Sequence, residues 1–403
     1  MPWLTFLQEN WELLTIPLVS AFVGWITNFL ALKMTFYPLE YYGLGPWIGW
    51  QGIVPSKATR MAEKSVDLML GKLINLEEQF SRLDSAAIAE MTKPELLLVS
   101  RKILDRIMRS QAPGIWGKTP ETIKDQIAQQ IADDLPEAVE LMMADLKDNI
   151  DELFDVKTTV IQTLIQDKAL LNEIFLTCGR EEFKFIERSG WYFGFLFGLI
   201  QMTIFYFYDP WWVLPLAGGI VGYATNWLAL RMIFSPLHPV KIGPWNIQGL
   251  FIKRQKQVAG EYAKIVSERV LNTTNIFNNI LYGKRKPKLI EIITRRIDAI
   301  MNHTTQNFRF LLDIFAQERY IVAKNIADYY FIDHFPILIH QISPYAEDAL
   351  DLENTFKEKM STLSPAEFQG FLRPVFQEDE LKLILIGALL GVIAGIIQLQ
   401  VFF

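Results

Sequence analysis

Two asparagines stand inside long apolar stretches of the chain, and their type and position could support chemistry most directly. Asn28 follows Thr27, and Asn226 follows Thr225. An amide in hydrocarbon without a hydrogen-bonding partner costs on the order of several kcal/mol, so each asparagine needs one. The two pairs could hold helices together, form a polar site for an ion or small substrate, or take part in catalysis. The substrate or helix-contact candidates are Thr27, Asn28, Thr225, Asn226, Gln201 and Gln398.

Both Thr-Asn pairs belong to a segment that occurs twice. Residues 24–47 and 222–245 are identical at thirteen of their twenty-four positions. Weaker matches continue after this segment and return near the ends of both copies. The repeat therefore predicts two tandem pseudo-symmetric halves, related by an axis along the membrane normal.

Four uncharged runs, each of 20 or 21 residues, indicate the class of protein. About 20 apolar residues in a helix cross a hydrocarbon core of ~30 Å, so each run can span a bilayer. We expect an all-α integral membrane protein with four transmembrane helices, each half built as span, cytoplasmic helical insert and span. The first half is 1–208, with spans at about 13–32 and 189–208 and an insert at about 38–185; the second is 209–403, with spans at about 210–230 and 383–403 and an insert at about 236–380.

Positive charge is confined to two blocks of the chain. All 39 Lys and Arg lie within residues 33–188 and 231–382. The positive-inside rule therefore predicts that both inserts are cytoplasmic and that both termini lie outside. No basic segment precedes the first run and no small-residue cleavage site follows it, so we expect a retained span and not a cleaved signal.

The segment after the first span changes character. The span should end before Pro38, because proline lacks a donor and disfavours helix in the preceding residue. Residues 39–54, rich in Gly, Trp and Tyr, are predicted to form a loop in the membrane interface. Beyond it, apolar residues recur every three or four positions through both inserts, which indicates helices. These stripes fit packing within a bundle, or a groove for lipid acyl chains or a second protomer.

Small residues share one face of each repeated span. Such residues let helix backbones approach closely in a membrane, where packing drives association. We expect the first and third spans to pack at the pseudo-two-fold axis, with Asn28 and Asn226 in contact across it. The helix-packing candidates are Gly24, Ala31, Gly222, Ala229, Gly194, Gly198, Gly391 and Gly395.

Charged side chains gather at the predicted inner ends of the spans. They fit interfacial anchoring by snorkelling side chains, or a ring of ion pairs that fixes the spans against the inserts. The interfacial charge candidates are Lys33, Arg231, Glu182, Asp379 and Glu380.

Composition and motifs argue against several functions. The net charge of −6 disfavours nucleic acid, which needs a basic face. The single cysteine, Cys178, excludes an intrachain disulfide, and the four histidines form no HExxH motif. The chain has no P-loop, no Rossmann fingerprint and no GxSxG elbow. We therefore predict no enzymatic activity, metal or cofactor.

The two copies GWITNFLALKM and GYATNWLALRM, together with GREEFKFIERSGWYFGFLFGLIQ and FQEDELKLILIGALLGVIAGIIQ, resemble the bacterial membrane proteins of domain-of-unknown-function family 445. The resemblance extends over essentially the whole chain. One departure is Pro55, which the second copy lacks before Ile252. The resemblance implies residence in the bacterial inner membrane and carries no established activity.

Two functions remain open at this point. The leading expectation is a non-enzymatic membrane-anchored scaffold, or a handler of lipid or another apolar partner through the inserts. The alternative is a small-solute or ion transporter that uses the paired Thr-Asn centre, and a membrane-bound enzyme comes third. The expected partners are the lipid bilayer and either lipid or another envelope protein, with a homo-oligomer also allowed.

Overall fold

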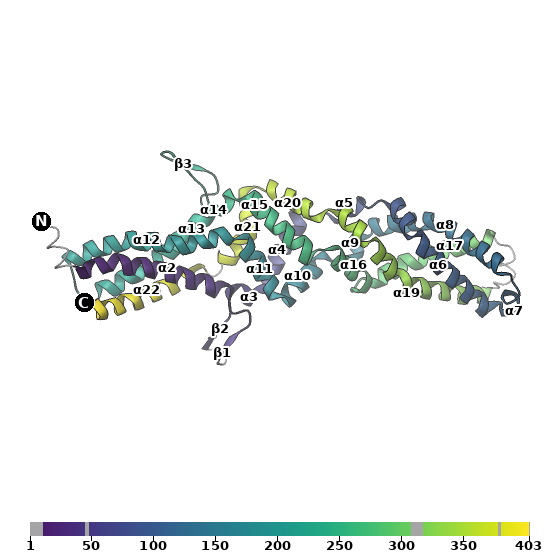
Figure 1. Cartoon of the computed structure of the whole chain (residues 1–403), viewed down its shortest axis with the longest axis horizontal. Coiled ribbons are helices and arrows are strands. Elements are labelled where there is room, and N and C mark those ends of the chain that lie inside the picture. The colour runs from purple at the N-terminus through teal and green to yellow at the C-terminus, as the bar shows by residue number, and fades with distance from the viewer. Residues whose placement is uncertain (1–10, 45–47, 308–316, 378–379, 403) are drawn as a thin grey trace. The chain divides into compact units, whose positions relative to one another are not determined.

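The computed structural model describes residues 11–44, 48–307, 317–377 and 380–402. In these ranges the chain is mainly helical, with two short antiparallel hairpins (Figure 1). Contacts divide it into two compact units, each of which takes segments from both halves of the sequence. Unit 1 comprises the described parts of Met1–Leu73, Val160–Val266 and Phe356–Phe403, and unit 2 comprises Ile74–Thr159 and Ser267–Thr355.

Unit 1 holds four helices that are long and apolar enough to cross a membrane. They are α2 (Thr15–Phe36), α12 (Arg180–Phe207), α13 (Val213–Phe234) and α22 (Glu380–Phe402), with the 3-10 turn η1 (Trp11–Leu14) before α2. Large apolar side chains remain exposed on their outer faces, as lipid-facing residues do. Examples are Leu18, Phe22, Leu196, Ile200, Leu216, Ile220, Leu389 and Ile393. The chain is therefore a multi-pass membrane protein.

Helix α12 begins well before its predicted span. The span was expected from residue 189, but the helix begins at Arg180. The charged residues that precede the apolar run continue the same helix, because nothing there breaks it. Hydropathy marks the part of a helix that can lie in hydrocarbon, whereas the hydrogen-bonded helix can extend beyond it.

The closest helix pairs in unit 1 are α2 with α12 and α13 with α22. A Cβ added to Gly24 would overlap the carbonyl of Gly190, and one added to Gly222 would overlap that of Gly387. Helices α2 and α13, the first and third spans, do contact one another, but the expectation that they pack through their small-residue faces is wrong. Each glycine face packs on the second span of its own half, because glycines on that span leave the matching space.

Both repeated spans end as the prolines require. Helix α2 ends at Phe36 and α13 ends at Phe234, each just before a cis X-Pro bond. A short hairpin follows each of these helices. The first consists of β1 (Tyr42–Leu44) and β2 (Ile48–Trp50) and lies in residues 39–54, which were predicted to form a loop. The second consists of β3 (Val240–Ile242) and β4 (Trp245–Ile247). Tyr42 pairs with Trp50, and Val240 pairs with Ile247.

Shorter helices complete unit 1. They are α3 (Ile53–Ser56), α4 (Ala58–Lys72), α11 (Lys168–Cys178), α14 (Leu250–Lys253), α15 (Gln255–Ile265) and α21 (Pro365–Gln377). Of the four boundaries between the units, one falls between Leu73 and Ile74, and the others fall in α10 (Val156–Gln166), η2 (Val266–Val270) and α20 (Leu352–Thr362). Phe251 of α14 stacks on Phe368 of α21 with ring centroids 4.5 Å apart, and both rings are fully buried. Aromatic packing of this kind forms the core beside the spans.

Unit 2 is built around four long helices. They are α6 (Ser85–Gln111), α8 (Glu121–Asp148), α17 (Lys286–Asn307) and α19 (Gln317–Leu350), in which α6 and α17 each contact both α8 and α19. The shorter elements are α5 (Leu76–Ser81), α7 (Pro113–Trp116), α9 (Ile150–Leu153) and α16 (Thr273–Tyr282). Asp84 caps α6 by accepting hydrogen bonds from the amides of Ala86 and Ala87. Unit 2 is thus a four-helix bundle whose helices come from both inserts.

Candidate functional site

The two asparagines lie at matching places but do not contact one another through hydrogen bonds. Asn28 Nδ2 donates to the carbonyl of Ile186 at 2.6 Å, and Asn226 Nδ2 donates to that of Leu383 at 2.9 Å. Neither Asn28 Oδ1 nor Asn226 Oδ1 has a partner in the described part of the chain. The predicted pairing of the asparagines is therefore wrong, because each binds the second span of its own half.

The accompanying threonines and glutamines are also buried. Thr27 Oγ1 donates to the carbonyl of Gly24 at 3.1 Å, a bond within its own helix, and Thr225 does the same to Gly222. Ser20 Oγ donates to Gln201 Oε1 at 3.0 Å, which joins α2 to α12. Gln398 is 3% exposed, and its Nε2 has no partner among the described residues. Among these groups only Ser20 and Gln201 join two side chains between helices; the threonines and asparagines use backbone carbonyls.

The predicted packing residues occupy the same two interfaces. A Cβ added to Gly194 or Gly198 would meet the backbone of α2, and one added to Gly391 or Gly395 would meet the backbone of α13. Ala229 is fully buried. Ala31 differs, because it lies in a small cluster with Ile53, Leu383 and Trp50. Close backbone contact thus surrounds both asparagines and leaves little room for a polar passage beside them.

The predicted interfacial charges separate into two groups. Lys33 lies over the rings of Phe29 and Tyr37, and Arg231 lies over the ring of Trp227. Such contacts are typical of cations anchored at a membrane interface. Glu380 begins α22 and is partly exposed, whereas Asp379 lies outside the described residues.

Glu182 has a different environment, which agrees with the alternative of ion pairs that fix the spans against the inserts, although the sequence did not identify its partner. It is 2% exposed, and Nη1 of Arg254 donates to both of its carboxylate oxygens at 2.9 and 2.7 Å. The two residues come from different halves of the chain. Glu182 was among the interfacial charge candidates, but no feature of the sequence identified Arg254 as its partner.

The ion pair lies in a buried cluster. Burial raises the pKa of the Cys178 thiol, and the Glu261 and Glu182 carboxylates raise it further. Burial likewise raises the pKa of Tyr262. A thiol held in its neutral form is a poor nucleophile, so this cluster has the chemistry of a structural core.

Unit 2 contains an apolar cavity of ≈110 Å³ between its four long helices. Its lining comes from α6 (Leu96, Val99, Ser100, Ile103, Leu104, Ile107), α8 (Ile131, Leu135), α17 (Ile297, Ile300, Met301) and α19 (Ala327, Phe331). The Ser100 hydroxyl is used within its own helix, since Oγ donates to the carbonyl of Leu96 at 2.6 Å. The cavity therefore offers an occupant apolar contact and little polar recognition.

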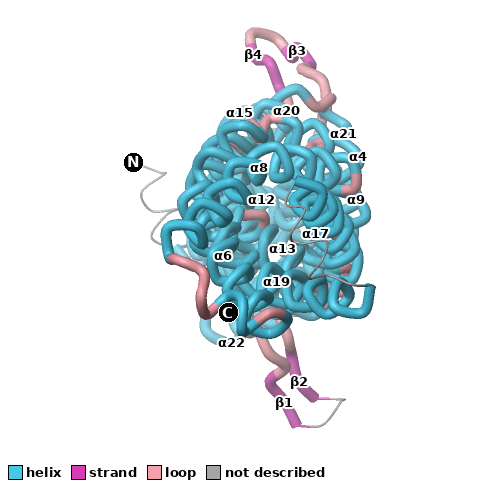
Figure 2. Tube along the Cα trace, turned by 90° about the vertical axis from the view of Figure 1, so that its right-hand side faces the viewer, coloured by secondary structure: helices cyan, strands magenta, loops and turns pink. Residues whose placement is uncertain are grey.

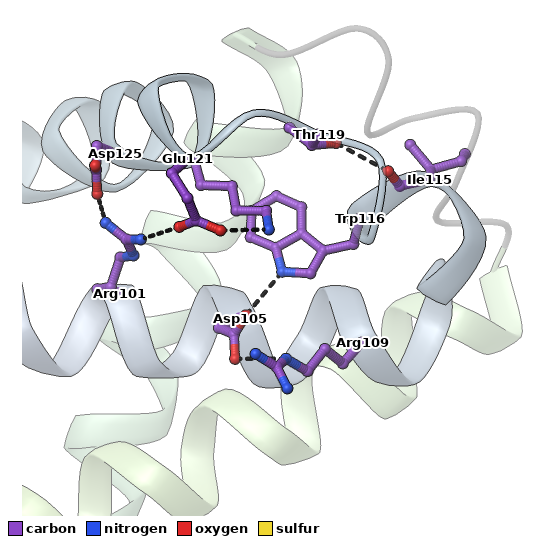
Figure 3. A network of polar contacts seen from close by, with 9 residues as sticks. Arg101, Asp105, Arg109, Ile115, Trp116, Thr119, Glu121 and Asp125 are labelled. Atoms are coloured by element: carbon purple, nitrogen blue, oxygen red, sulfur yellow. Dashed lines mark hydrogen bonds and ion pairs between the residues drawn. The ribbon is translucent and has the colours of Figure 1, made fainter.

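A network of polar side chains connects α6, α7 and the start of α8 (Figure 3). The Trp116 indole donates to Asp105 at 2.8 Å, and Lys124 lies over the indole ring, 5.0 Å from its centroid. Arg101 pairs with Glu121 and Asp125 across from α6 to α8. Burial opposes ionisation of Asp105, but the Trp116 hydrogen bond and Arg109 outweigh it and lower its pKa. The network holds α6, α7 and α8 in register where they turn.

Metal-ligating side chains do not gather at any of these sites. Across residues 11–44, 48–307, 317–377 and 380–402, no group of three or more His, Cys, Asp or Glu is placed to hold a metal ion.

Comparison with known proteins supports a bacterial membrane protein. No protein-family model matches the chain, and no solved structure matches it. The chain is 27% identical over 159 residues to a UPF0754 membrane protein of Staphylococcus carnosus, covering 37% of this chain and 41% of that protein. It is 24% identical over 206 residues to a UPF0754 membrane protein of Bacillus cereus, covering 45% and 54%. The chain thus spans about half or less of these two relatives.

A further relative extends over almost the whole length. The chain is 21% identical over 431 aligned positions to a UPF0754 membrane protein of Synechococcus, covering 96% of this chain and 98% of that protein. All three relatives are named as membrane proteins of bacteria. Together with the four apolar helices, they support a multi-pass bacterial membrane protein.

Proposed function

We propose that this protein is a non-enzymatic, membrane-anchored binding protein whose unit 2 bundle holds an apolar ligand, the acyl chain of a lipid. The observation that carries the proposal is the apolar cavity between α6, α8, α17 and α19. The matched contacts of the two repeat copies support an arrangement in tandem pseudo-symmetric halves. Inner-membrane residence, cytoplasmic inserts, external termini and membership of family 445 belong to the same proposal.

The size and lining of the cavity favour an apolar occupant. An engineered cavity of ~150 Å³ lined by Leu, Ile and Phe stays dry and binds benzene, so a space of ≈110 Å³ suits a short stretch of hydrocarbon. At ~24 cal/mol per Å³, leaving such a space empty costs roughly 2–3 kcal/mol. An acyl chain that fills it would recover part of that free energy without forming any hydrogen bond.

Close packing around the asparagines favours this function over transport. Thr27 and Asn28 are fully buried, and each donates a hydrogen bond to a backbone carbonyl, Thr27 within its own helix and Asn28 to Ile186 of α12. A passage for solute or ions would need hydrated polar groups that line a common space. Helix contact is the better explanation for this centre.

The test uses a photoactivatable fatty acid in lipid nanodiscs that contain the full-length protein. After irradiation, mass spectrometry locates the cross-linked peptides. We expect labels on the peptides of α6 and α19 that line the cavity. In the variant Ala327→Leu a larger side chain fills the space, and labelling of these peptides should fall several-fold.

A matched variant on the same helix controls for added hydrophobicity. Asn325 is exposed on α19, so Asn325→Leu adds the same side chain outside the cavity and should leave labelling unchanged. Absence of cavity labels in the wild type, or equal labelling in Ala327→Leu, would overturn the proposal. Excess of an unlabelled fatty acid should compete with the probe.

A further inference from the structure

The two β-hairpins begin just beyond the ends of membrane-spanning helices. β1 starts six residues after α2 ends at Phe36, and β3 starts six residues after α13 ends at Phe234. Within unit 1 the hairpins extend away from the helices on opposite sides, in both views (Figures 1 and 2). Each hairpin therefore lies beside the end of a span and does not cover another helix.

Hydrogen bonds at the base hold each hairpin to its span. The Gly52 amide donates to the carbonyl of Pro38 at 2.9 Å, and the Gly249 amide donates to that of Pro236 at 2.9 Å. The Gln51 side chain donates to the carbonyl of Leu39, and Gln248 repeats this bond in the second copy. The direction in which each hairpin leaves the span is thus set by local bonds.

Apolar and aromatic side chains on the hairpins are exposed. Tyr42 is 83% exposed and Leu44 is 85% exposed, and Val240 and Ile247 are also exposed. Residues 41–56 contain no charged side chain, and the second hairpin carries one, Lys241. In water such a surface would be a liability for aggregation, because an unpaired hairpin also presents open backbone edges.

We propose that both hairpins lie in the headgroup layer of the bilayer, as two lateral anchors at the end of the spans. Only five residues separate each hairpin from the membrane-spanning helix that precedes it. Tyr and Trp favour this layer, where one part of the ring is apolar and another is wet. The layer adds about 5–7 Å on each side of the hydrocarbon, and there water and headgroups can satisfy the open strand edges.

The unpaired strand edges of the hairpins determine how deep the hairpins can lie in the bilayer. Unpaired strand edges do not occur in hydrocarbon, since each unsatisfied amide or carbonyl there costs several kcal/mol, as an order of magnitude. The exposed Lys241 can reach a lipid phosphate while the strand stays level with the headgroups. The anchors would limit tilt and rotation of unit 1, independently of any ligand in unit 2.

Single fluorophores at defined places test this depth. Cys178 is the only cysteine, so Cys178→Ala provides a background for labelling Leu44→Cys on β1 and Asn246→Cys on β4 with an environment-sensitive dye. Ile200→Cys on the outer face of α12 serves as the hydrocarbon control, and Lys118→Cys in unit 2 as the aqueous control. The proteins are reconstituted in phospholipid vesicles.

Three quenchers separate the outcomes. Lipids brominated near the headgroup should quench the dyes at residues 44 and 246 several-fold more than lipids brominated near the chain ends, and aqueous iodide should quench them less than residue 118. Residue 200 should show the reverse lipid preference. Iodide quenching at 44 and 246 equal to that at 118 would overturn the proposal. Protection from all three quenchers would assign the hairpins to a protein contact and overturn it as well.

Discussion

Arg254 Nη1 donates to both carboxylate oxygens of Glu182 at 2.9 and 2.7 Å, which joins a residue of the second insert to the membrane-proximal turn of α12. The Glu182 side chain is 2% exposed and the Arg254 side chain 19% exposed. Breaking a buried ion pair by removing one partner costs about 3–5 kcal/mol, because the other charge is left unpaired. This contact therefore stabilises unit 1 between segments far apart in sequence.

We predict that Glu182→Gln lowers the free energy of unfolding by about 3–5 kcal/mol. The double variant Glu182→Leu with Arg254→Leu should be more stable than Glu182→Gln, since it leaves no buried charge. Denaturant titration in mild detergent measures both. The neighbouring exposed pair Glu181–Lys184 gives the control, and Glu181→Gln should have little effect. Equal losses in Glu182→Gln and Glu181→Gln would contradict the structural role.

Glycine contacts between spans give a second prediction. Gly24→Ala places a methyl group against the carbonyl of Gly190, whose oxygen and carbon are backbone atoms that cannot turn away. Overpacking of this kind costs about 1–3 kcal/mol. Gly71→Ala in α4 has open space around it and should gain up to about 1 kcal/mol. If both variants changed the free energy of unfolding in the same direction relative to the wild type, this would argue against the α2–α12 contact.

The asparagines should act independently. Asn28→Leu and Asn226→Leu each remove one hydrogen bond between membrane helices, worth about 0.6 kcal/mol on average and up to about 1.7 kcal/mol. Because the acceptors are Ile186 and Leu383 on different helices, the losses in the double variant should add. A double-mutant cycle checks this. A coupling energy well above ~0.5 kcal/mol would restore a direct contact between the two.

Removing the charge of Asp298 and removing that of Asp328, two carboxylates near Lys324, should change stability in opposite directions. Lys324 Nζ lies 2.6 Å from Asp298 Oδ2, and this hydrogen bond raises the pKa of the lysine. The contribution of the pair to stability is present at neutral pH and is lost only as pH rises through the folded pKa of the lysine. Asp298→Asn should therefore destabilise unit 2 at pH 7.

The charge of Asp328 destabilises the folded protein, in contrast to that of Asp298. Burial raises its pKa, and its Oδ1 has no partner in the described part of the chain. A raised carboxyl pKa means that the ionised form opposes folding above the folded pKa, and that the cost disappears as pH falls and the group takes up a proton. Asp328→Asn should stabilise the protein at pH 7, with a gain that shrinks toward acidic pH. Thermal unfolding across this pH range checks the trend, and a gain that grows on acidification would refute it.

Much of the architecture followed from local features of the chain. The uncharged runs predicted all four spans, because length and lack of charge are what crossing hydrocarbon requires. Pro38 predicted the end of α2, since it removes a donor and restricts its neighbour. Periodic apolar residues predicted that the inserts are helical. Each of these properties depends on residues close together in sequence.

Only the tertiary structure decided which helices and side chains contact one another. Helical periodicity places Gly24, Asn28 and Ala31 along one side of a helix, but it does not say which helix packs there, and the one predicted was wrong. Glu182 meets Arg254, and the cavity in unit 2 forms, only when segments of both inserts come together. The hairpins depend on backbone pairing across a turn, which hydropathy does not encode. Local physics determined which elements form, and long-range complementarity of shape and charge decided what each element contacts.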